Sequence, residues 1–172
     1  MKQLLNKETV KRVEYFIKKF DSNLEVLILK STAKTAKDAA NSLKCELGAI
    51  VKSLVFKADK EFLVCLVSGD KKCSLNKLKK ILKKKDVAMA NADEVKINTG
   101  FSIGGVAPVA HIKKMNILID KCLNRFQYVY GAAGHPDCVF KITYQNLVKL
   151  TNGMESELTK WKDLKLFQLI NL

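Results

Sequence analysis

Two kinds of hydrophobic spacing occur along the 172 residues of the chain. Val10, Val13 and Ile17 recur at intervals of three and four residues, which predicts a helix over roughly 7–20. The segments "AIVKSLVF" and "EFLVCLV" are instead short runs rich in β-branched residues, joined by the polar "KADK". This pattern is typical of a β-hairpin.

The remaining segments continue the mixture of helices and strands. A helix is expected in "TAKDAANSLKCEL", where Thr35 and Asp38 form an N-terminal capping signature and Gly48 ends the element. Further helices are expected in "KKCSLNKLKKILKKK", from Asn91 and in "TYQNLVKLTNG", and strands in "LEVLIL", near 87–90 and in "NILID", "YVYG" and "CVFKI". Because no regular βαβα alternation is present, the predicted fold is α+β: a mixed, mainly antiparallel sheet with surrounding helices.

The length favours a single domain over 1–172, with an N-terminal helix within 1–21 and an amphipathic helical tail over 154–172. The N-terminus does not resemble a signal peptide, and no apolar run reaches the length of a membrane span. Five cysteines without C-x-x-C spacing argue for reduced thiols, no metal site and a cytoplasmic location. We expect a monomer that does not contact membranes.

A net charge of +14 favours a polyanionic partner, most often nucleic acid. The basic residues are nearly all lysine, a skew that an AT-rich genome also produces. The densest cluster spans 71–85, where Lys77, Lys80 and Lys84 are candidate RNA contacts around an amphipathic helix. The competing interpretation of this cluster is a solvated helix face.

The segment "TGFSIGGVAPVAH" at 99–111 contains "GFSIG", which fits the G-x-S-x-G pattern of a serine hydrolase. A nucleophile elbow needs a strand before the serine and a helix directly after it. Two glycines and Pro108 follow Ser102 and cannot sustain a helix, so Ser102 is predicted to be a loop hydroxyl. The glycines allow backbone N–H groups to hold a carbonyl oxygen or a phosphate, although spacing alone favours a simple turn.

Lys52 is an unexpected residue in its strand, because both faces of "AIVKSLVF" are otherwise largely apolar. Its ammonium either extends to the surface near a strand end or points into a pocket, where a buried charge needs a partner.

Five blocks occur in an order that resembles the YbaK/EbsC-like family: "TAKDAANSL", "IVKSLVF", "VSGDKKCSLNKL", "TGFSIGGVAPVAH" and "GAAGHPDCVFKITYQNLVKLTNG". These proteins are free-standing relatives of the editing domain of bacterial prolyl-tRNA synthetases, and the resemblance covers 32–153. It implies a deacylase that hydrolyses the ester of a mischarged tRNA in trans, often tRNA(Pro), without a cofactor. The implied partner is tRNA, with prolyl-tRNA synthetase as a second candidate. A tRNA-binding module without catalysis is the alternative.

The resemblance also implies roles for particular residues. Lys52 aligns with a lysine that holds the substrate, and Gly104 and Gly105 belong to the loop beside the scissile ester. The implied substrate contacts are Thr35, Ser102, Val106, Pro108, His111 and Asp70. Cysteine-editing members commonly carry Pro-Phe-Gly where this chain has Pro108-Val109-Ala110, so alanyl, seryl and threonyl esters remain candidates beside cysteinyl.

Overall fold

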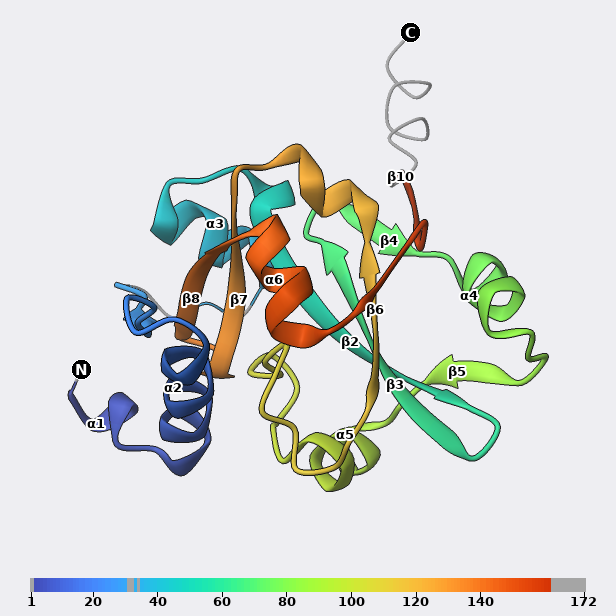
Figure 1. The fold of residues 1–172 in the computed structure, drawn as a ribbon, viewed down its shortest axis with the longest axis horizontal. Coiled ribbons are helices and arrows are strands. Elements are labelled where there is room, and N and C mark those ends of the chain that lie inside the picture. Colours follow the sequence, from blue (N-terminus) through green and yellow to red (C-terminus); the bar gives the residue numbers. More distant parts are fainter. Residues whose placement is uncertain (1, 31–32, 34, 162–172) are drawn as a thin grey trace, which may run out of the picture.

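The computed structural model in Figure 1 describes residues 2–30, 33 and 35–161. One mixed sheet holds eight strands in the order β1-β8-β7-β2-β3-β6-β9, with β5 paired to β2 outside this path. The strands are β1 (Leu27–Ile28), β2 (Ile50–Ala58), β3 (Glu61–Ser68), β5 (Val87–Met89), β6 (Asn116–Asp120), β7 (Tyr128–His135), β8 (Cys138–Thr143) and β9 (Met154–Ser156). A two-stranded sheet joins β4 (Lys71–Cys73) to β10 (Thr159–Trp161).

Pairing is antiparallel in the β2–β3 hairpin, in β7–β8 and where β2 meets β5, and parallel for β2–β7, β3–β6 and β6–β9. The predicted α+β class, with its mixed and mainly antiparallel sheet, is confirmed.

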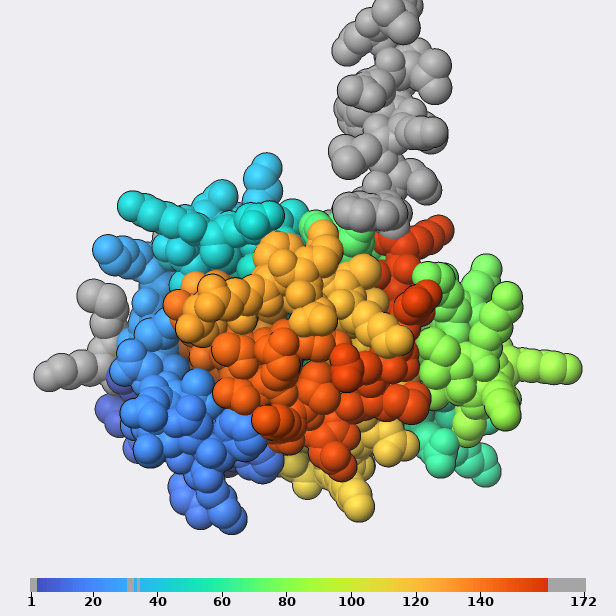
Figure 2. Space-filling view, turned by 45° about the horizontal axis from the view of Figure 1, so that its top comes forward, coloured from blue at the N-terminus to red at the C-terminus, as the bar shows by residue number. Residues whose placement is uncertain are grey.

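Helices cover the sheet and its ends. They are α1 (Lys2–Leu5), α2 (Glu8–Phe20), α3 (Ala36–Leu43), α4 (Leu75–Leu82), α5 (Ala92–Thr99) and α6 (Tyr144–Thr151). Figure 1 shows α2 beside β7 and β8 at one end of the molecule and α4 beyond β4 and β5 at the other. In Figure 2, α4 lies in green at one edge, far from the blue N-terminal helices. Within the described part of the chain, no helix is long and apolar enough to cross a bilayer.

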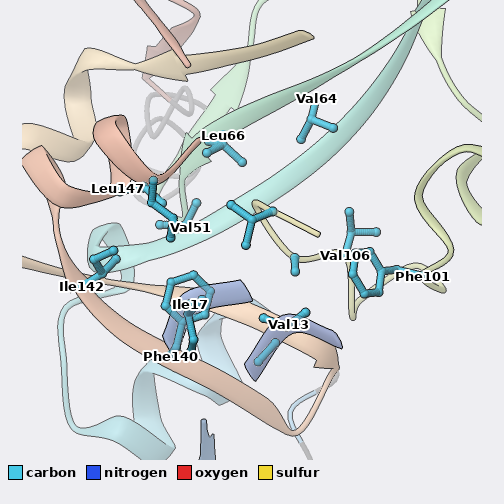
Figure 3. Close-up of a cluster of buried hydrophobic side chains, with 14 of the residues drawn as sticks. Val13, Ile17, Val51, Val64, Leu66, Phe101, Val106, Phe140, Ile142 and Leu147 are labelled. Atoms are coloured by element: carbon cyan, nitrogen blue, oxygen red, sulfur yellow. The ribbon is translucent and has the colours of Figure 1, made fainter. Parts of the chain in front are cut away.

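The main core lies between β2, α2, β8 and α6. Figure 3 shows Ile17 of α2 beside Phe140 of β8, with Val51 of β2 and Leu147 of α6 close by. The opposite face of β2 contributes to other clusters, because Ile50 packs under α3 and Phe56 packs with α4. β2 is therefore buried on both faces, as its sequence predicted.

The predicted end of the third helix at Gly48 is wrong. α3 ends at Leu43, and Lys44 adopts a left-handed conformation with φ +53° while its N–H donates to the carbonyls of Ala40 and Asn41. Gly48 lies in a following 3-10 turn (Leu47–Ala49), where a Cβ would be 2.5 Å from the ring of Phe126. The glycine is needed for this close approach rather than to terminate the helix.

The predicted helical tail is also wrong over its first part, where β9 and β10 are strands. Between them, Leu158 is fully buried and its N–H donates to Asp120 Oδ1, while the Thr159 hydroxyl donates to Asp120 Oδ2 at 2.6 Å. β9 pairs with β6 and β10 pairs with β4. These pairings and the buried Asp120 carboxylate favour strands over the helix that the hydrophobic spacing predicted. Residues 162–172 lie outside the described part of the chain.

Candidate functional site at the interrupted edge of β2

One edge of β2 is interrupted halfway along the strand. β3 pairs with β2 continuously over 51–58. On the other edge, β7 pairs only with Ile50 and Val51, and β5 pairs only with Phe56–Ala58. Among the described residues, no strand therefore lies beside 52–55 on this edge. A cavity of about 220 Å³ occupies the gap.

The walls of the cavity come from segments that are distant in sequence. Lys52 and Ser53 lie on β2, Thr35 caps α3, and Tyr130 comes from β7. The other lining residues are mostly apolar: Ala33, Ala36, Ala39, Ile50, Val51, Leu54, Val55, Met89, Ala90, Val95, Ile103, Gly104, Val106, Ala132, Pro136 and Val139. Met89 and Ile103 are 59% and 63% exposed. The cavity is thus narrow and largely apolar, with a few polar groups along β2 and α3.

The glycine-rich loop makes a tight turn instead of a nucleophile elbow. The N–H of Gly105 donates to the Ser102 carbonyl at 3.0 Å, and Gly104 adopts φ +89°. These features define a type II turn over 102–105, with glycine where positive φ is required. No helix follows Ser102, which is exposed. The prediction that Ser102 is a loop residue is confirmed.

Gly105 serves a different purpose from Gly104. A Cβ at Gly105 would lie 3.0 Å from His135 Cα and 3.1 Å from its backbone nitrogen. The absence of a side chain therefore lets the loop pack directly against the end of β7. This contact fixes the distance between the loop and the interrupted edge of β2.

Two sets of backbone groups remain available near the cavity. The Gly105 N–H is engaged in the turn, whereas the Gly104 N–H has no hydrogen-bond partner among the residues that the structure describes. On β2, the Val55 carbonyl accepts from the Ala90 N–H at 3.0 Å, so Val55 directs its backbone groups to the interrupted edge. Because alternate residues of a strand point the same way, Ser53 directs its N–H and C=O into the gap.

Lys52 lines the cavity and also has a partner within the protein. Its side chain is half-buried, and its ammonium donates to the Lys71 carbonyl at the start of β4 at 2.5 Å. This bond fixes the ammonium beside the start of β4, the strand that follows β3. The structure thus brings Lys52 together with Gly104, Val106 and Thr35, the sequence-predicted residues that border the cavity.

Other predicted site residues lie outside the cavity lining. Ser102 and Gly105 belong to the turn, and Pro108 is buried where a Cβ at Gly131 would be 2.9 Å from its ring. The Nε2–H of His111 donates to the Ala107 carbonyl at 2.8 Å, and the His111 ring meets the Phe101 ring edge-on. Burial, helped by the charge of Arg12, lowers the pKa of His111. Pro108 and His111 therefore pack within and beneath the loop and do not face the cavity.

Asp70 likewise lies outside the cavity lining. Its carboxylate accepts from Arg125 at 2.8 Å and from the Ser68 hydroxyl at 2.6 Å. Burial acts to raise the pKa of Asp70, but the hydrogen bonds from Arg125 and Ser68 hold that pKa below its ordinary value. The environment of Asp70 is that of a structural ion pair.

The candidate RNA contacts lie on and after α4, in the region seen in green in Figure 2. Lys77 donates to the Thr159 carbonyl at 2.9 Å, and Lys84 pairs with both Asp59 and Glu61, at 3.1 and 2.9 Å. Lys80 is exposed. A shallow hollow, here called the lysine surface, is lined by Lys79, Lys80, Lys83, Lys84 and Lys85.

Among the residues of the site that the sequence did not predict, Ser53 and Asp137 have polar groups that bear on its structure. Ser53 borders the cavity, and its hydroxyl is buried without a hydrogen-bond partner among the described residues. Asp137 accepts from the Ala33 N–H at 2.9 Å through Oδ1, which ties the cavity wall near α3 to the β7–β8 turn. For Ser53, its place next to Lys52 in the same strand was an available signal; for Asp137 there was none.

A family model described as the aminoacyl-tRNA editing domain matches residues 30–150. The chain belongs to the aminoacyl-tRNA editing domain family. This match confirms the sequence-level resemblance to YbaK/EbsC-like proteins, and its range includes every lining residue of the cavity. The cavity at the interrupted edge of β2 therefore lies wholly within the matched domain.

Particular relatives agree with this assignment. The editing domain is 27% identical, over 73% of the chain and 77% of the relative, to the proposed Cys-tRNA(Pro)/Cys-tRNA(Cys) deacylase EbsC of Enterococcus faecalis. It superimposes with a TM-score of 0.85 and 33% identity on the crystal structure of a proposed trans-editing enzyme for prolyl-tRNA synthetase, covering 90% of this chain and 98% of that one. The proline-tRNA ligase of Caldicellulosiruptor saccharolyticus is 34% identical over 44% of the chain, which spans only 13% of that ligase.

Proposed function

We propose that this protein is a trans-acting deacylase that hydrolyses the ester of tRNA(Pro) carrying a small non-cognate amino acid. The observation that carries the proposal is the cavity at the interrupted edge of β2, bordered by both Lys52 and Gly104. Its small volume and apolar walls suit the side chain of a small amino acid. A separate hydrolytic site is needed in translation because a synthetic pocket discriminates weakly between small apolar side chains.

The chemistry requires no nucleophile from the protein, because an aminoacyl ester is already activated. Hydrolysis needs a donor for the carbonyl oxygen as negative charge develops on it, and a fixed position for the ester. The Gly104 N–H and the strand-edge N–H of Ser53 are candidate donors. Lys52, oriented by the Lys71 carbonyl, is assigned to position the substrate near the same edge. The attacking group is water or a group of the substrate itself.

The lysine surface supports the tRNA part of the proposal. Lys80, Lys83 and Lys85 are exposed and form no ion pair within the described residues. Ammonium groups of this kind attract phosphates without reading sequence. Lys77 and Lys84 hold protein partners, so we assign them mainly to the stability of this region. Prolyl-tRNA synthetase is the proposed protein partner, because proline-tRNA ligases contain a segment similar to part of this chain.

A deacylation screen tests the proposal directly. The protein is incubated with tRNA(Pro) charged with alanine, cysteine, serine, threonine or proline, and loss of each ester is followed by acid-precipitable label. We expect rapid hydrolysis of one or more small non-cognate esters and slow hydrolysis of prolyl-tRNA(Pro). Tight tRNA binding without acceleration of any ester would instead support the non-catalytic RNA-binding module.

A further inference from the structure

The Ser53 hydroxyl is buried in the interrupted edge of β2 without a hydrogen-bond partner among the described residues. It lies on the same face of β2 as Val51 and Val55, which belong to the main core. Leaving a buried hydroxyl unpaired costs about 1–3 kcal/mol, so such groups call for a specific explanation. The cavity provides one, because Ser53 is part of its lining.

The surroundings of Ser53 indicate which part of a ligand would reach it. On this face of the strand, Ala90, Val95 and Val106 border the cavity and belong to the main core. These side chains carry no hydrogen-bonding atoms. The Ser53 hydroxyl is therefore a polar group within an apolar wall, the arrangement by which a pocket fixes one polar atom of its ligand.

We propose that Ser53 is a specificity-determining residue, which hydrogen-bonds the hydroxyl or thiol of a short amino-acid side chain held in the cavity. This inference rests on the proposed function for the identity of the ligand. It predicts that the cavity binds seryl, threonyl and cysteinyl groups more tightly than alanyl, because the methyl group of alanine leaves the Ser53 hydroxyl unpaired. A site built to bond a substrate hydroxyl rejects the analogue that lacks it far more strongly than an apolar pocket rejects a methylene.

The test uses pairs of ligands that differ by one hydroxyl. Non-hydrolysable adenosines carrying seryl or alanyl in amide linkage at the 3′ position are titrated calorimetrically against the wild type and Ser53→Ala. Hydrolysis of seryl- and alanyl-tRNA(Pro) is measured in parallel. The wild type should prefer the seryl ligand by about tenfold, the value of one hydrogen bond of ordinary strength. Ser53→Ala should reduce this ratio to near one by weakening seryl binding alone.

Ser42 provides a matched control. Its hydroxyl on α3 is also buried and without a partner among the described residues, but Ser42 does not line the cavity. Ser42→Ala should leave the seryl-to-alanyl ratio unchanged. Both alanine variants should keep or gain stability in chemical denaturation, since each removes an unpaired buried hydroxyl.

The outcomes separate this inference from the proposed function. Equal seryl and alanyl affinities in the wild type, or equal weakening of both in Ser53→Ala, would overturn the role of Ser53 in specificity; the second result would place it at the ester or the amino group. A Ser53-dependent binding preference without hydrolysis would keep the inference and refute the deacylase. Hydrolysis with a seryl-to-alanyl ratio that is the same in the wild type and Ser53→Ala would support the deacylase and refute the role of Ser53.

Discussion

The cavity beside β2 and the lysine surface near α4 hold their functional groups in opposite ways. At the cavity, a turn, a strand edge and the hydrogen bond from Lys52 to Lys71 fix each group through the backbone. At the lysine surface, Lys80, Lys83 and Lys85 are exposed on side chains with many rotamers. Chemistry at an ester needs fixed donors, whereas attraction of a polyanion needs only charge of the right sign. Substitutions should therefore have sharp effects in the first region and graded effects in the second.

Among substitutions in the loop and in the lysine surface, Gly105→Val should give the largest effect. The new side chain would meet the backbone of His135 and Gly134, which cannot move aside without disturbing β7. The loop would shift away from the interrupted edge, and a misplacement of about 1 Å costs about 100-fold in rate. We expect at least this loss in single-turnover deacylation, with a loss of stability typical of overpacking, about 1–3 kcal/mol.

Gly104→Ala is the companion variant. A Cβ at Gly104 has more room, with Pro136 Cγ at 3.4 Å, but φ +89° is unfavourable for alanine. Stability should fall by about 1–2 kcal/mol, while the packing of the loop on β7 is kept. Equal rates in Gly105→Val and the wild type would show that the loop position does not matter for hydrolysis.

Neutralising the lysine surface should have an intermediate effect. The triple variant Lys80→Gln, Lys83→Gln, Lys85→Gln removes three charges. Glutamine keeps a good helix former at position 80, which is the only one of the three within α4. Affinity for uncharged tRNA should fall by about tenfold, and the slope of log K against log salt should decrease by up to about three. Fluorescence anisotropy over a salt series measures both quantities. Deacylation at saturating enzyme should change little.

The matched control removes the same charge from the opposite end of the molecule (Figure 1), in a triple glutamine variant of Lys11, Lys18 and Lys19 on α2. If both triple variants weaken binding equally, attraction depends on net charge alone, and the lysine surface is only a solvated helix face.

Acid pH should lower the free energy of unfolding through His111, which packs behind the glycine-rich loop. Burial lowers the pKa of His111, so the unfolded chain binds a proton that the folded chain resists. Stability contributed by neutral His111 is present above the unfolded pKa and is lost as the pH falls below about 6.5. His111→Gln should reduce the slope of unfolding free energy against pH between 7 and 5.5 by up to about 1.4 kcal/mol per unit. Urea titrations across this range measure it; an unchanged slope would contradict the assigned burial effect.

Ala110→Gly should give the smallest change. Ala110 adopts φ +60° in the loop, a conformation that glycine accepts at lower cost. Relief of this strain exceeds the extra chain entropy of glycine, so we expect stabilisation of about 0.5–1 kcal/mol in denaturant unfolding. A destabilised variant would show that the methyl group packs usefully at this position.

Local signals in the sequence predicted local structure well. Thr35 and Asp38 form the expected capping box at the start of α3, and the β2–β3 hairpin forms where the β-rich runs predicted it. The type II turn also follows from local chemistry, since glycine stands where positive φ is needed.

Features that depend on distant pairing could not be predicted. The cavity exists because β7 and β5 meet β2 at different places, and neither register is encoded in β2 alone. Asp120 captures Leu158 and Thr159 from 38 and 39 residues away, which converts a helical spacing into strands. The pairing of Lys84 with both Asp59 and Glu61 could not be predicted either, because a count of charges gives no information about which residues are close in space.

The central claim is that the cavity, and not a serine nucleophile, hydrolyses the ester. Single-turnover deacylation by Lys52→Ala and Ser102→Ala, measured side by side on the best ester from the screen, tests it most directly. Circular dichroism first confirms that both variants are folded. Loss of a positioning contact costs about 10²–10³-fold in rate, so Lys52→Ala should be slowed to this extent while Ser102→Ala keeps most of its activity. An inactive Ser102→Ala beside a fully active Lys52→Ala would contradict the account and restore the serine hydrolase.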